Sequence, residues 1–354
     1  MKKTSVDFLR ALIEAPSPSG FEQPAQRVVR QRVEELSDEL RTDVHGNVIA
    51  VKNPGGSPRV MLAGHCDQVG MMIQHITDDG YLKFASIGGI DATVLAGAQV
   101  VVYGEKGAVP GVVGRKPVHL MKPEERDNAK ISIDSLFIDI GAKDKKAAQK
   151  LVQIGDCATY KLGMVDLEGD LRVSPGFDDK VGAFVVMEAL RLLKGKNIDC
   201  ALYCVSTVQE EIGLRGASTS AFGIDPLVGI AVDVTHATDY ADVDGSRTGV
   251  INMGEGPAIA RGPNINPRVG QLLLDTAKDK KIPYQVEPEP RGTGTDANAI
   301  QVTRAGVAAG LVSIPNRYMH TPVEVVHLGD LEHAAELLAE AVTRIDDKLD
   351  FVPL

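Results

Sequence analysis

The chain has 354 residues, 44% of them hydrophobic, and a formal net charge of −10 at pH 7. This length exceeds the size at which one hydrophobic core usually stops growing, so we expect two domains. The negative charge argues against nucleic-acid binding, and the absence of Trp with only 4% aromatic residues argues against the stacking platforms of carbohydrate-binding proteins.

The N-terminal segment leads directly into an amphipathic helical pattern, with no apolar leader peptide before it. No apolar run approaches the ~20 residues needed to span a bilayer. The four cysteines form no Cys-x-x-Cys pair, which is typical of a reducing compartment. We therefore expect a soluble, cytoplasmic protein with neither membrane nor nucleic acid among its partners.

Hydrophobic periodicity predicts helices and strands in the first part of the chain, and only strands after it. A helix is predicted over 23–40, and strands over 47–52 and 59–63. From about Met71, Gly, Asp and Pro turns separate short apolar runs, and this pattern predicts further strands at 71–76, 81–85, 99–103, 109–113 and 136–139.

Helical patterns return after Asp178 and alternate with strands, at 181–193, 269–280, 297–303 and 328–349. The order of elements predicts an α/β fold with a mixed central sheet and flanking helices, interrupted by an all-β insertion. We place the catalytic domain at 1–68 and 166–354 and the β-rich insertion at 69–165.

The most informative segment is 205–216, where an apolar run ends in the adjacent carboxylates Glu210 and Glu211 and a glycine-rich turn. Two neighbouring acids repel each other, so both stay ionised at the edge of an apolar core mainly where cations or solvent compensate them. A bound metal ion would use one of them as a ligand and leave the other free to act as a base. A solvated acidic turn is the alternative.

Three other apolar runs lead into candidate metal ligands, namely His65, Asp233 and His320. In open α/β sheets, ligands bind outside the carboxyl ends of the strands, so we expect these side chains to meet in one crevice. Imidazole and carboxylate ligands together suit zinc, cobalt or manganese. Residues i and i+2 of an extended segment face the same way, so Asp67 is expected to accept a hydrogen bond from the His65 ring.

Five motifs, taken in this order, resemble those of the tetrahedral aminopeptidases, a family of dinuclear-metal exopeptidases. They are GHCDQVG at 64–70, FDDKVG at 177–182, EEIGLRGA at 210–217, VDVTH at 232–236 and YMHTP at 318–322. The resemblance covers nearly the whole chain, and five motifs in order are far more specific than any one of them. It implies a fold like that of zinc exopeptidases.

The resemblance also implies a role for each candidate ligand. Asp178 would bridge two metal ions, with His65 and Asp233 completing one ligand set and Glu211 and His320 completing the other. The ions would be Zn²⁺, Co²⁺ or Mn²⁺, and the sequence does not decide among them.

Glu210 is then the general base, and Asp67 orients His65. The resemblance further implies a cis peptide bond between Asp178 and Asp179. Which of these two aspartates bridges the ions stays open, because Asp179 is also a candidate N-cap for the helix that follows.

A glycine-rich turn precedes the predicted helix at 297–303. By its position in the family it forms a wall of the substrate pocket, with Gly292, Thr293, Gly294, Thr295 and Asp296 as substrate-binding residues. A helix-capping loop with Thr295 or Asp296 as N-cap is the alternative. The turn lacks the residue order of a nucleotide-binding loop.

We therefore predict a dinuclear metal-dependent aminopeptidase that removes N-terminal residues from short peptides with a free N-terminus, using water activated by Glu210. A related metal-dependent deacylase or amidohydrolase and a catalytically silent peptide-binding shell are the alternatives. The resemblance implies that the β-rich insertion forms dimers and that the dimers assemble into a tetrahedral homododecamer.

The sequence leaves the side-chain preference open. Arg261, Arg291 and Arg317 are candidates for binding an acidic N-terminal residue, and ordinary surface arginines are the alternative.

Overall fold

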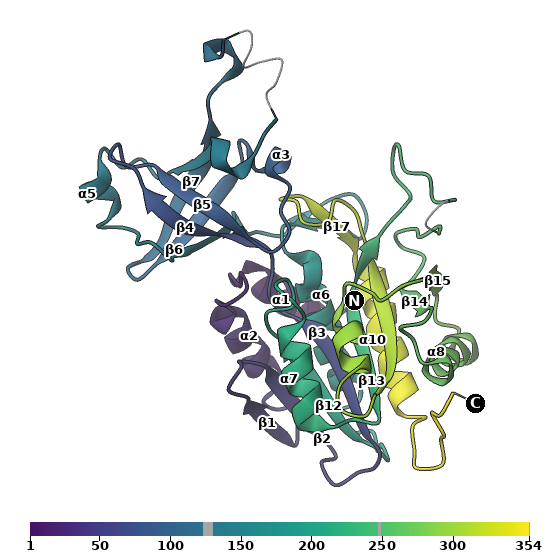
Figure 1. The fold of residues 1–354 in the computed structure, drawn as a ribbon. Coiled ribbons are helices and arrows are strands. Elements are labelled where there is room, and N and C mark those ends of the chain that lie inside the picture. Colours follow the sequence, from purple (N-terminus) through teal and green to yellow (C-terminus); the bar gives the residue numbers. More distant parts are fainter. Residues whose placement is uncertain (123–129, 247–248, 354) are drawn as a thin grey trace.

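The computed structural model describes residues 1–122, 130–246 and 249–353. It contains an α/β body and a smaller all-β body that projects from it (Figure 1). The α/β body is built on an eight-stranded sheet with the spatial order β1 (Glu39–Thr42), β2 (Val48–Lys52), β12 (Ala201–Thr207), β3 (Arg59–His65), β13 (Val228–His236), β16 (Ala308–Asn316), β14 (Ala258–Arg261) and β15 (Gln285–Pro288).

The sheet is mixed, and its centre is parallel. Strands β12, β3, β13 and β16 run parallel to one another, whereas β2 and β14 pair with this group in antiparallel fashion. Central parallel strands are covered on both faces, which explains why their sequences are nearly continuous apolar runs. Because these strands share one direction, the segments that follow them meet at one edge of the sheet.

Helices cover both faces of this sheet. Along β3, Val60 and Leu62 point into one core, and Met61 and Ala63 into the other, as the alternation of a strand requires. The larger core lies under α1 (Lys3–Glu14), α2 (Gln23–Val33), α6 (Phe177–Leu192), α8 (Pro267–Lys280) and α10 (Leu328–Val342). The smaller core lies under α7 (Arg215–Ile224) and α9 (Asp296–Gln301).

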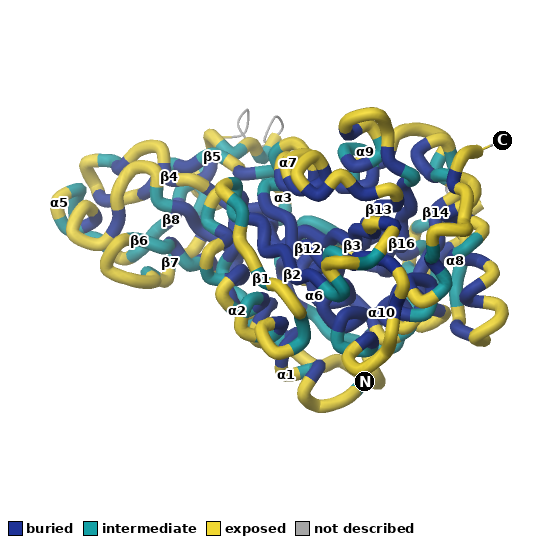
Figure 2. Tube along the Cα trace, turned by 90° about the horizontal axis from the view of Figure 1, so that it is seen from below, coloured by how far each residue is buried: buried dark blue, intermediate teal, exposed yellow. Residues whose placement is uncertain are grey.

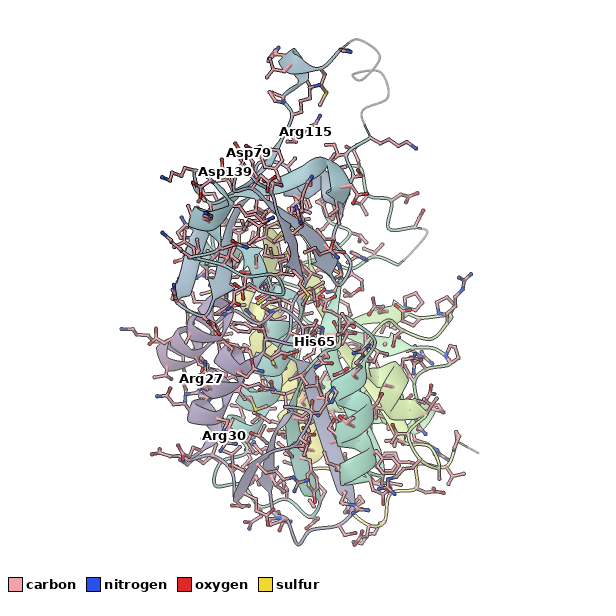
Figure 3. The ribbon with its side chains drawn as sticks, turned by 60° about the vertical axis from the view of Figure 1, so that its left-hand side comes forward. Arg27, Arg30, His65, Asp79, Arg115 and Asp139 are labelled. Atoms are coloured by element: carbon pink, nitrogen blue, oxygen red, sulfur yellow. The ribbon has the colours of Figure 1, made fainter. Side chains whose placement is uncertain are left out.

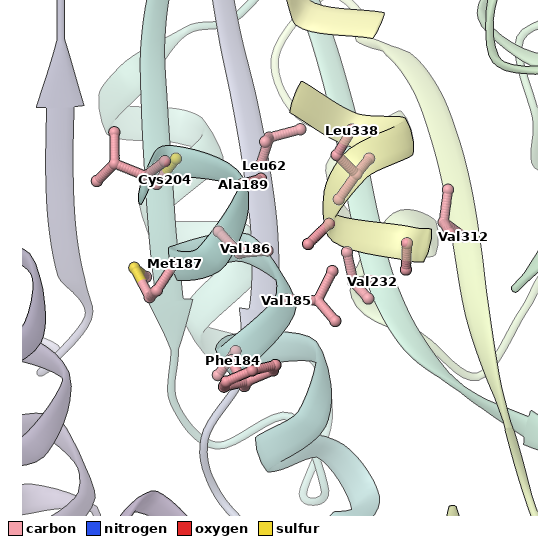
Figure 4. Close-up of a cluster of buried hydrophobic side chains, with 14 of the residues drawn as sticks. Leu62, Phe184, Val185, Val186, Met187, Ala189, Cys204, Val232, Val312 and Leu338 are labelled. Atoms are coloured by element: carbon pink, nitrogen blue, oxygen red, sulfur yellow. The ribbon is translucent and has the colours of Figure 1, made fainter. Parts of the chain in front are cut away.

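Helix α6 is the central helix of the larger core and carries the Asp178–Asp179 pair at its start. Its residues Val185 and Ala189 pack among Leu62, Val232 and Leu338 from two strands and α10 (Figure 4). These side chains are essentially inaccessible to solvent, as are most residues of the central strands (Figure 2). The helix is therefore packed rigidly against the centre of the sheet, and this packing limits where its first turn can lie.

The all-β body is a closed barrel with its own apolar core, which includes Met71, Leu82 and Ile138. Its strands, in order around the barrel, are β4 (Gly70–Ile76), β5 (Leu82–Ile87), β8 (Leu136–Asp139), β7 (Gly107–Arg115), β6 (Gln99–Gly104) and β9 (Cys157–Tyr160). Short helical segments lie between them, namely α3 (Ala92–Leu95), η1 (Val118–Leu120), η2 (Ile133–Ser135) and α5 (Lys145–Ala148).

A small antiparallel sheet lies in the α/β body close to the barrel (Figure 1). It consists of β10 (Val165–Asp166), β11 (Leu171–Ser174) and β17 (Glu324–His327). Among the described residues, no helix is both long and apolar enough to cross a membrane.

The predicted fold class is confirmed, since a mixed sheet with flanking helices is accompanied by a separate antiparallel barrel. Several element boundaries were wrong. The helix predicted over 23–40 ends at Val33, where Ser37 Oγ donates a hydrogen bond to the Val33 carbonyl, and Leu40 instead pairs with Ala50 between β1 and β2. The pairing of these strands outweighs the helical pattern of the segment.

Further predicted elements differ from the structure at their ends. The helix predicted over 328–349 ends at Val342, where the Thr343 hydroxyl donates to the Glu340 carbonyl. Strands β13 and β16 continue past the apolar runs that lead into Asp233 and His320, because they pair with each other as far as His236 and Asn316. The short strands β1 and β9 and the helix α7 were not predicted.

Candidate active site and metal centre

The carboxyl edge of the parallel strands brings the predicted ligands together. His65 ends β3, Asp233 lies in β13, Glu211 follows β12 and His320 follows β16. Asp178 comes from the start of α6. In Figure 3 the labelled His65 lies in the middle of the molecule, beneath the barrel.

Within the described residues, these side chains form two groups whose donor atoms are close enough to hold a metal ion. His65, Asp178 and Asp233 form the first group, and Asp178, Glu211 and His320 form the second. In each group the donor atoms all lie within 4.8 Å of one another. The two groups share Asp178, so the arrangement has the form of two neighbouring cation sites joined by one carboxylate.

The two oxygens of Asp178 face different imidazoles. Asp178 Oδ1 lies 3.4 Å from His65 Nε2, and Asp178 Oδ2 lies 3.0 Å from His320 Nε2. Asp179 is turned away from both groups, because its Oδ1 accepts a hydrogen bond from the Gly182 amide and its Oδ2 accepts one from the His65 amide. Asp179 thus has the contacts of an N-cap, and the peptide bond between the two aspartates is cis.

Glu210 lies beside the first group without belonging to it. Its Oε2 is 3.6 Å from His65 Nε2, and only 8% of the residue surface is exposed. A buried carboxylate next to the ligands, but free of both donor groups, is placed to exchange a proton with a molecule bound between them.

Asp67 was expected to accept a hydrogen bond from the His65 ring, but its carboxylate mainly binds other groups. Its carboxylate accepts hydrogen bonds from the Ser19 hydroxyl at 2.6 Å and from the amides of Glu210 and Glu211 at 3.0 and 3.2 Å. The His65 Nδ1 atom lies 3.1 Å from the Asp67 carbonyl oxygen and 3.4 Å from the nearer carboxylate oxygen. Asp67 therefore contacts His65 with its main chain as well as its side chain, while its carboxylate braces the Glu-Glu turn.

His320 is held by two residues that the sequence reasoning missed. Its Nδ1 lies 2.7 Å from the carbonyl oxygen of Gly89, which follows barrel strand β5, and its amide donates to Glu324 Oε1 at 3.2 Å. The other oxygen of Glu324 accepts a hydrogen bond from the Asp178 amide at 2.9 Å. Glu324 therefore connects the backbones of two ligands, although its position in the short strand β17 gave no signal in the sequence.

A cavity of about 310 Å³ opens beside the donor groups. Four of the five residues predicted to bind substrate line it, namely Gly292, Thr293, Gly294 and Thr295. Asp296 lies below the wall, where its carboxylate accepts a hydrogen bond from the Thr207 hydroxyl at 2.5 Å. Thr295 occupies the N-cap position of α9 but makes no side-chain capping bond.

The three arginines proposed from the sequence do not line this cavity. Arg317 forms an ion pair with Asp239 at 2.7 Å, and Arg261 and Arg291 are exposed. His236 lies at the cavity rim and belongs to neither donor group.

The comparison with known protein families agrees with this geometry. The model of the M42 glutamyl aminopeptidases matches residues 46–337 of the chain. The chain belongs to this family. The resemblance drawn from the five motifs is thereby confirmed, and so is the prediction of a peptide-hydrolysing enzyme of the aminopeptidase type.

Individual relatives of this M42 chain match nearly its whole length. It is 39% identical to the lysyl aminopeptidase of Pyrococcus furiosus over 98% of the chain and 99% of the relative. The crystal structure of a TET aminopeptidase from a marine-sediment archaeon of the Thaumarchaeota superposes with a TM-score of 0.93 at 34% identity, covering 98% of each chain. The TET1 peptidase of Pyrococcus horikoshii superposes with a TM-score of 0.86 at 30% identity, covering 96% of this chain and 100% of the other.

The charges at the M42 site are unbalanced without cations. Burial raises the pKa of Glu210 to about 10 and those of Glu211 and Asp233 to about 8. Burial opposes the charged form of Asp178 too, but hydrogen bonds from His320 and His65 bring its pKa well below the usual range. More carboxylates than imidazoles are buried here, so protons must remain on some of them unless cations replace those protons.

For the imidazoles, burial lowers the pKa and the neighbouring acids raise it. Burial disfavours the charged form of His320, yet the hydrogen bond to Asp178 and the charge of Glu211 raise its pKa to about 9. Glu211 also has one buried oxygen, Oε1, with no hydrogen-bond partner among the described residues. A divalent cation in each donor group would supply the missing positive charge and the missing partner, so the residues present fit a pair of metal ions.

Proposed function

We propose that this chain is a dinuclear metal-dependent aminopeptidase that removes N-terminal residues from short peptides. The observation that supports this proposal best is the pair of donor groups that share Asp178 beside the buried, unligated carboxylate of Glu210. In this proposal His65 and Asp233 complete the ligands of one ion, and Glu211 and His320 complete those of the other.

Two divalent ions held by these residues would polarise the scissile carbonyl, lower the pKa of the attacking water and offer a ligand position to the free α-amino group of the substrate. Glu210 Oε2 then takes a proton from that water and passes it to the nitrogen of the leaving amine. The high pKa of Glu210 in the metal-free protein falls when positive charge is placed next to it, so Glu210 acts as a base only in the loaded site.

Other residues of the chain position these groups. Asp67 holds the amides of the Glu-Glu turn, and Glu324 holds those of Asp178 and His320. The wall formed by Gly292–Thr295 lines the same cavity as the ligands and is suited to contact the substrate backbone.

We extend the proposal to domain organisation and assembly. The barrel strands lie between Gly70 and Tyr160, in the range 69–165 assigned to the insertion, and the remaining chain forms the α/β body. The TET1 peptidase from Pyrococcus horikoshii is described as able to assemble into a tetrahedron or a large octahedral shell. By analogy we propose that the barrel mediates dimerisation and that dimers of this chain form a dodecameric shell.

The names of the relatives do not define one substrate. The family description refers to glutamyl residues and the Pyrococcus furiosus relative is named a lysyl aminopeptidase, so these names differ in the charge of the residue removed. A metal-dependent deacylase and a silent peptide-binding shell also remain as alternatives.

The test is hydrolysis of a panel of aminoacyl anilides and short peptides, each with a free and an N-acetylated terminus. The protein is stripped with a chelator and then assayed alone and with zinc, cobalt or manganese restored. Metal-dependent cleavage of only the free substrates is the expected result. Cleavage of the acetylated substrates would favour the deacylase, and no cleavage despite stoichiometric metal would favour the peptide-binding shell.

A further inference from the structure

The sheet carries a second pair of carboxylates, Glu287 and Glu289, into the cavity that contains the donor groups. Glu287 lies in the outermost strand, β15, and only 7% of its surface is exposed. Glu289 follows that strand and is half-buried. Neither residue belongs to the two donor groups.

The strand register places Glu287 on the same face of the sheet as the ligand Asp233. Asp233 pairs with Ser313, Ser313 with Ala258, and Glu287 with Ala260, which lies two residues after Ala258. Directly paired residues face the same side, and so do residues i and i+2. The side chains between Asp233 and Glu287 on this face are those of Ser313, Ala258 and Ala260. They are small, so a hollow remains over β16 and β14.

A hydrogen bond to β13 fixes the position of Glu287 relative to the proposed ligand Asp233. The Thr235 hydroxyl, which donates a hydrogen bond to Glu287 Oε1, lies two residues beyond Asp233 on β13. Two residues of a strand span about 7 Å. The carboxylate of Glu287 is therefore held beside Thr235, which lies one strand repeat beyond the proposed ligand Asp233, and Leu311 and Ser313 also line the cavity.

The electrostatic surroundings of Glu287 are those of a cation site. Burial raises its pKa, hydrogen bonds from Thr235 and Ser313 lower it, and the like charge of Glu289 raises it again. No lysine or arginine of the described chain lines this cavity. The two carboxylates consequently lack a positive partner, which an incoming cationic group would provide.

We propose that Glu287 and Glu289 bind the positively charged side chain of an N-terminal lysine or arginine, so that the enzyme prefers peptides with a basic first residue. This inference rests on the proposed aminopeptidase function. With the α-amino group at the donor groups, the flexible four-carbon stem of lysine lies over Leu311 and Ser313, and its ammonium group reaches Glu287. The preference is opposite to the one expected from Arg261, Arg291 and Arg317, which lie outside the cavity lining.

The experiment compares kcat/KM of the metal-loaded enzyme for the p-nitroanilides of Lys, Arg, Leu and Glu. The wild type is expected to cleave the Lys and Arg substrates at least about 10-fold better than the Leu substrate, because charge-assisted hydrogen bonds in a partly buried site are stronger than neutral ones. Glu287→Gln keeps an oxygen that accepts the Thr235 hydrogen bond but removes the charge. It should lower the Lys-to-Leu ratio about 10-fold, mainly through KM for the Lys substrate.

Two further variants separate charge recognition from damage to the fold. Glu289→Gln, at a half-buried position, should lower the same ratio by a smaller factor. Glu35→Gln removes one exposed carboxylate just beyond α2, far from the cavity, and should leave the ratio unchanged.

The outcomes distinguish this inference from the function on which it rests. If the wild type cleaves the Leu or Glu substrate better than the Lys substrate, or if Glu287→Gln leaves the ratio unchanged, the basic preference is wrong and the aminopeptidase function stands. If no free aminoacyl substrate is cleaved with any metal, the proposed function fails and this inference fails with it.

Discussion

The two donor groups that share Asp178 are built from different parts of the fold. In the first group, His65 and Asp233 lie in adjacent parallel strands, so their separation follows from the register of a buried sheet. In the second group, Glu211 and His320 lie in segments beyond their strands, and the His320 side chain is 31% exposed.

The supports of the two groups differ accordingly. The first group rests on the sheet and α6, whereas His320 depends on the Gly89 carbonyl from the barrel side and on Glu324 from β17. A rigid sheet holds ligands more accurately than loops do. The barrel, beyond any role in assembly, therefore helps to shape one half of the proposed metal centre.

The largest expected difference is between the two histidines. His65→Ala should lose the ion of the buried group and nearly all turnover. His320→Ala should keep that ion, lose the other and retain the fold. Metal content per chain after gel filtration, measured together with turnover, checks this prediction. Equal metal loss in the two variants would mean that the groups do not bind independently.

A smaller effect is expected from alanine substitutions at two glycines of the barrel segment. Gly88 has φ +75°, and a Cβ there would lie 3.1 Å from Val69 Cγ1 and 3.2 Å from Glu211 Oε2. Gly97 has φ +92° and no atom within 4 Å of such a Cβ. Both alanines are strained by the positive φ, which costs on the order of 1 kcal/mol, but only Gly88→Ala displaces a proposed ligand.

Gly88→Ala should therefore lower activity about 10-fold or more and weaken binding of the second ion, as changes around metal ligands commonly do. Gly97→Ala should lose a similar amount of stability but keep its activity and its binding of the second ion. Thermal unfolding and turnover of the two variants, measured side by side, give the comparison. If their activities fall equally, the contact with Glu211 has no influence on the site.

The smallest effect concerns Glu22, a buried acid outside both donor groups, which accepts a hydrogen bond from the Gly20 amide at 2.6 Å. Burial raises its pKa from 4.5 to about 7. Between these values the folded protein binds the proton more tightly than the unfolded chain, so the stability contributed by the protonated group is lost as the pH rises from about 4.5 to 7.

Glu22→Gln should remove this part of the pH dependence, on the order of 1–3 kcal/mol, in metal-loaded protein whose ligands stay ionised. Urea unfolding at pH 5 and pH 7.5 measures it, with wild type as the control. An unchanged difference in unfolding free energy between the two pH values would show that Glu22 does not titrate in this range. Glu22, which lies outside both donor groups, would thus titrate with pH, whereas the metal-bound ligands would stay ionised.

The sequence allowed the positions of the candidate ligands to be predicted where a continuous apolar strand ends in a polar residue. His65, Asp233 and the Glu210–Glu211 pair have this pattern, and strands of one direction bring such ends together. The family resemblance added the prediction that Asp178 is shared between the two sets of ligands. The fold class followed from the same alternation of patterns.

Other features depend on contacts between segments that are distant in the sequence. Glu324 and Gly89 act through hydrogen bonds that involve main-chain atoms, and Gly88 leaves room for the Glu211 side chain. No local pattern predicts these contacts. Glu287 faces the cavity only because β14 turns antiparallel beside β16 and carries β15 with it. The helix predicted over 23–40 was too long for the related reason that β1 pairs with β2.

The most direct test of the account is the metal content and turnover of Glu210→Gln measured on one preparation, with Glu22→Gln as a buried-acid control. We expect two ions per chain, as in the wild type, and turnover reduced about 10²–10⁴-fold, because the ligands remain and the base is gone. Glu22→Gln should keep both the ions and the turnover. Full activity of Glu210→Gln with both ions bound would contradict the role of Glu210 as the base.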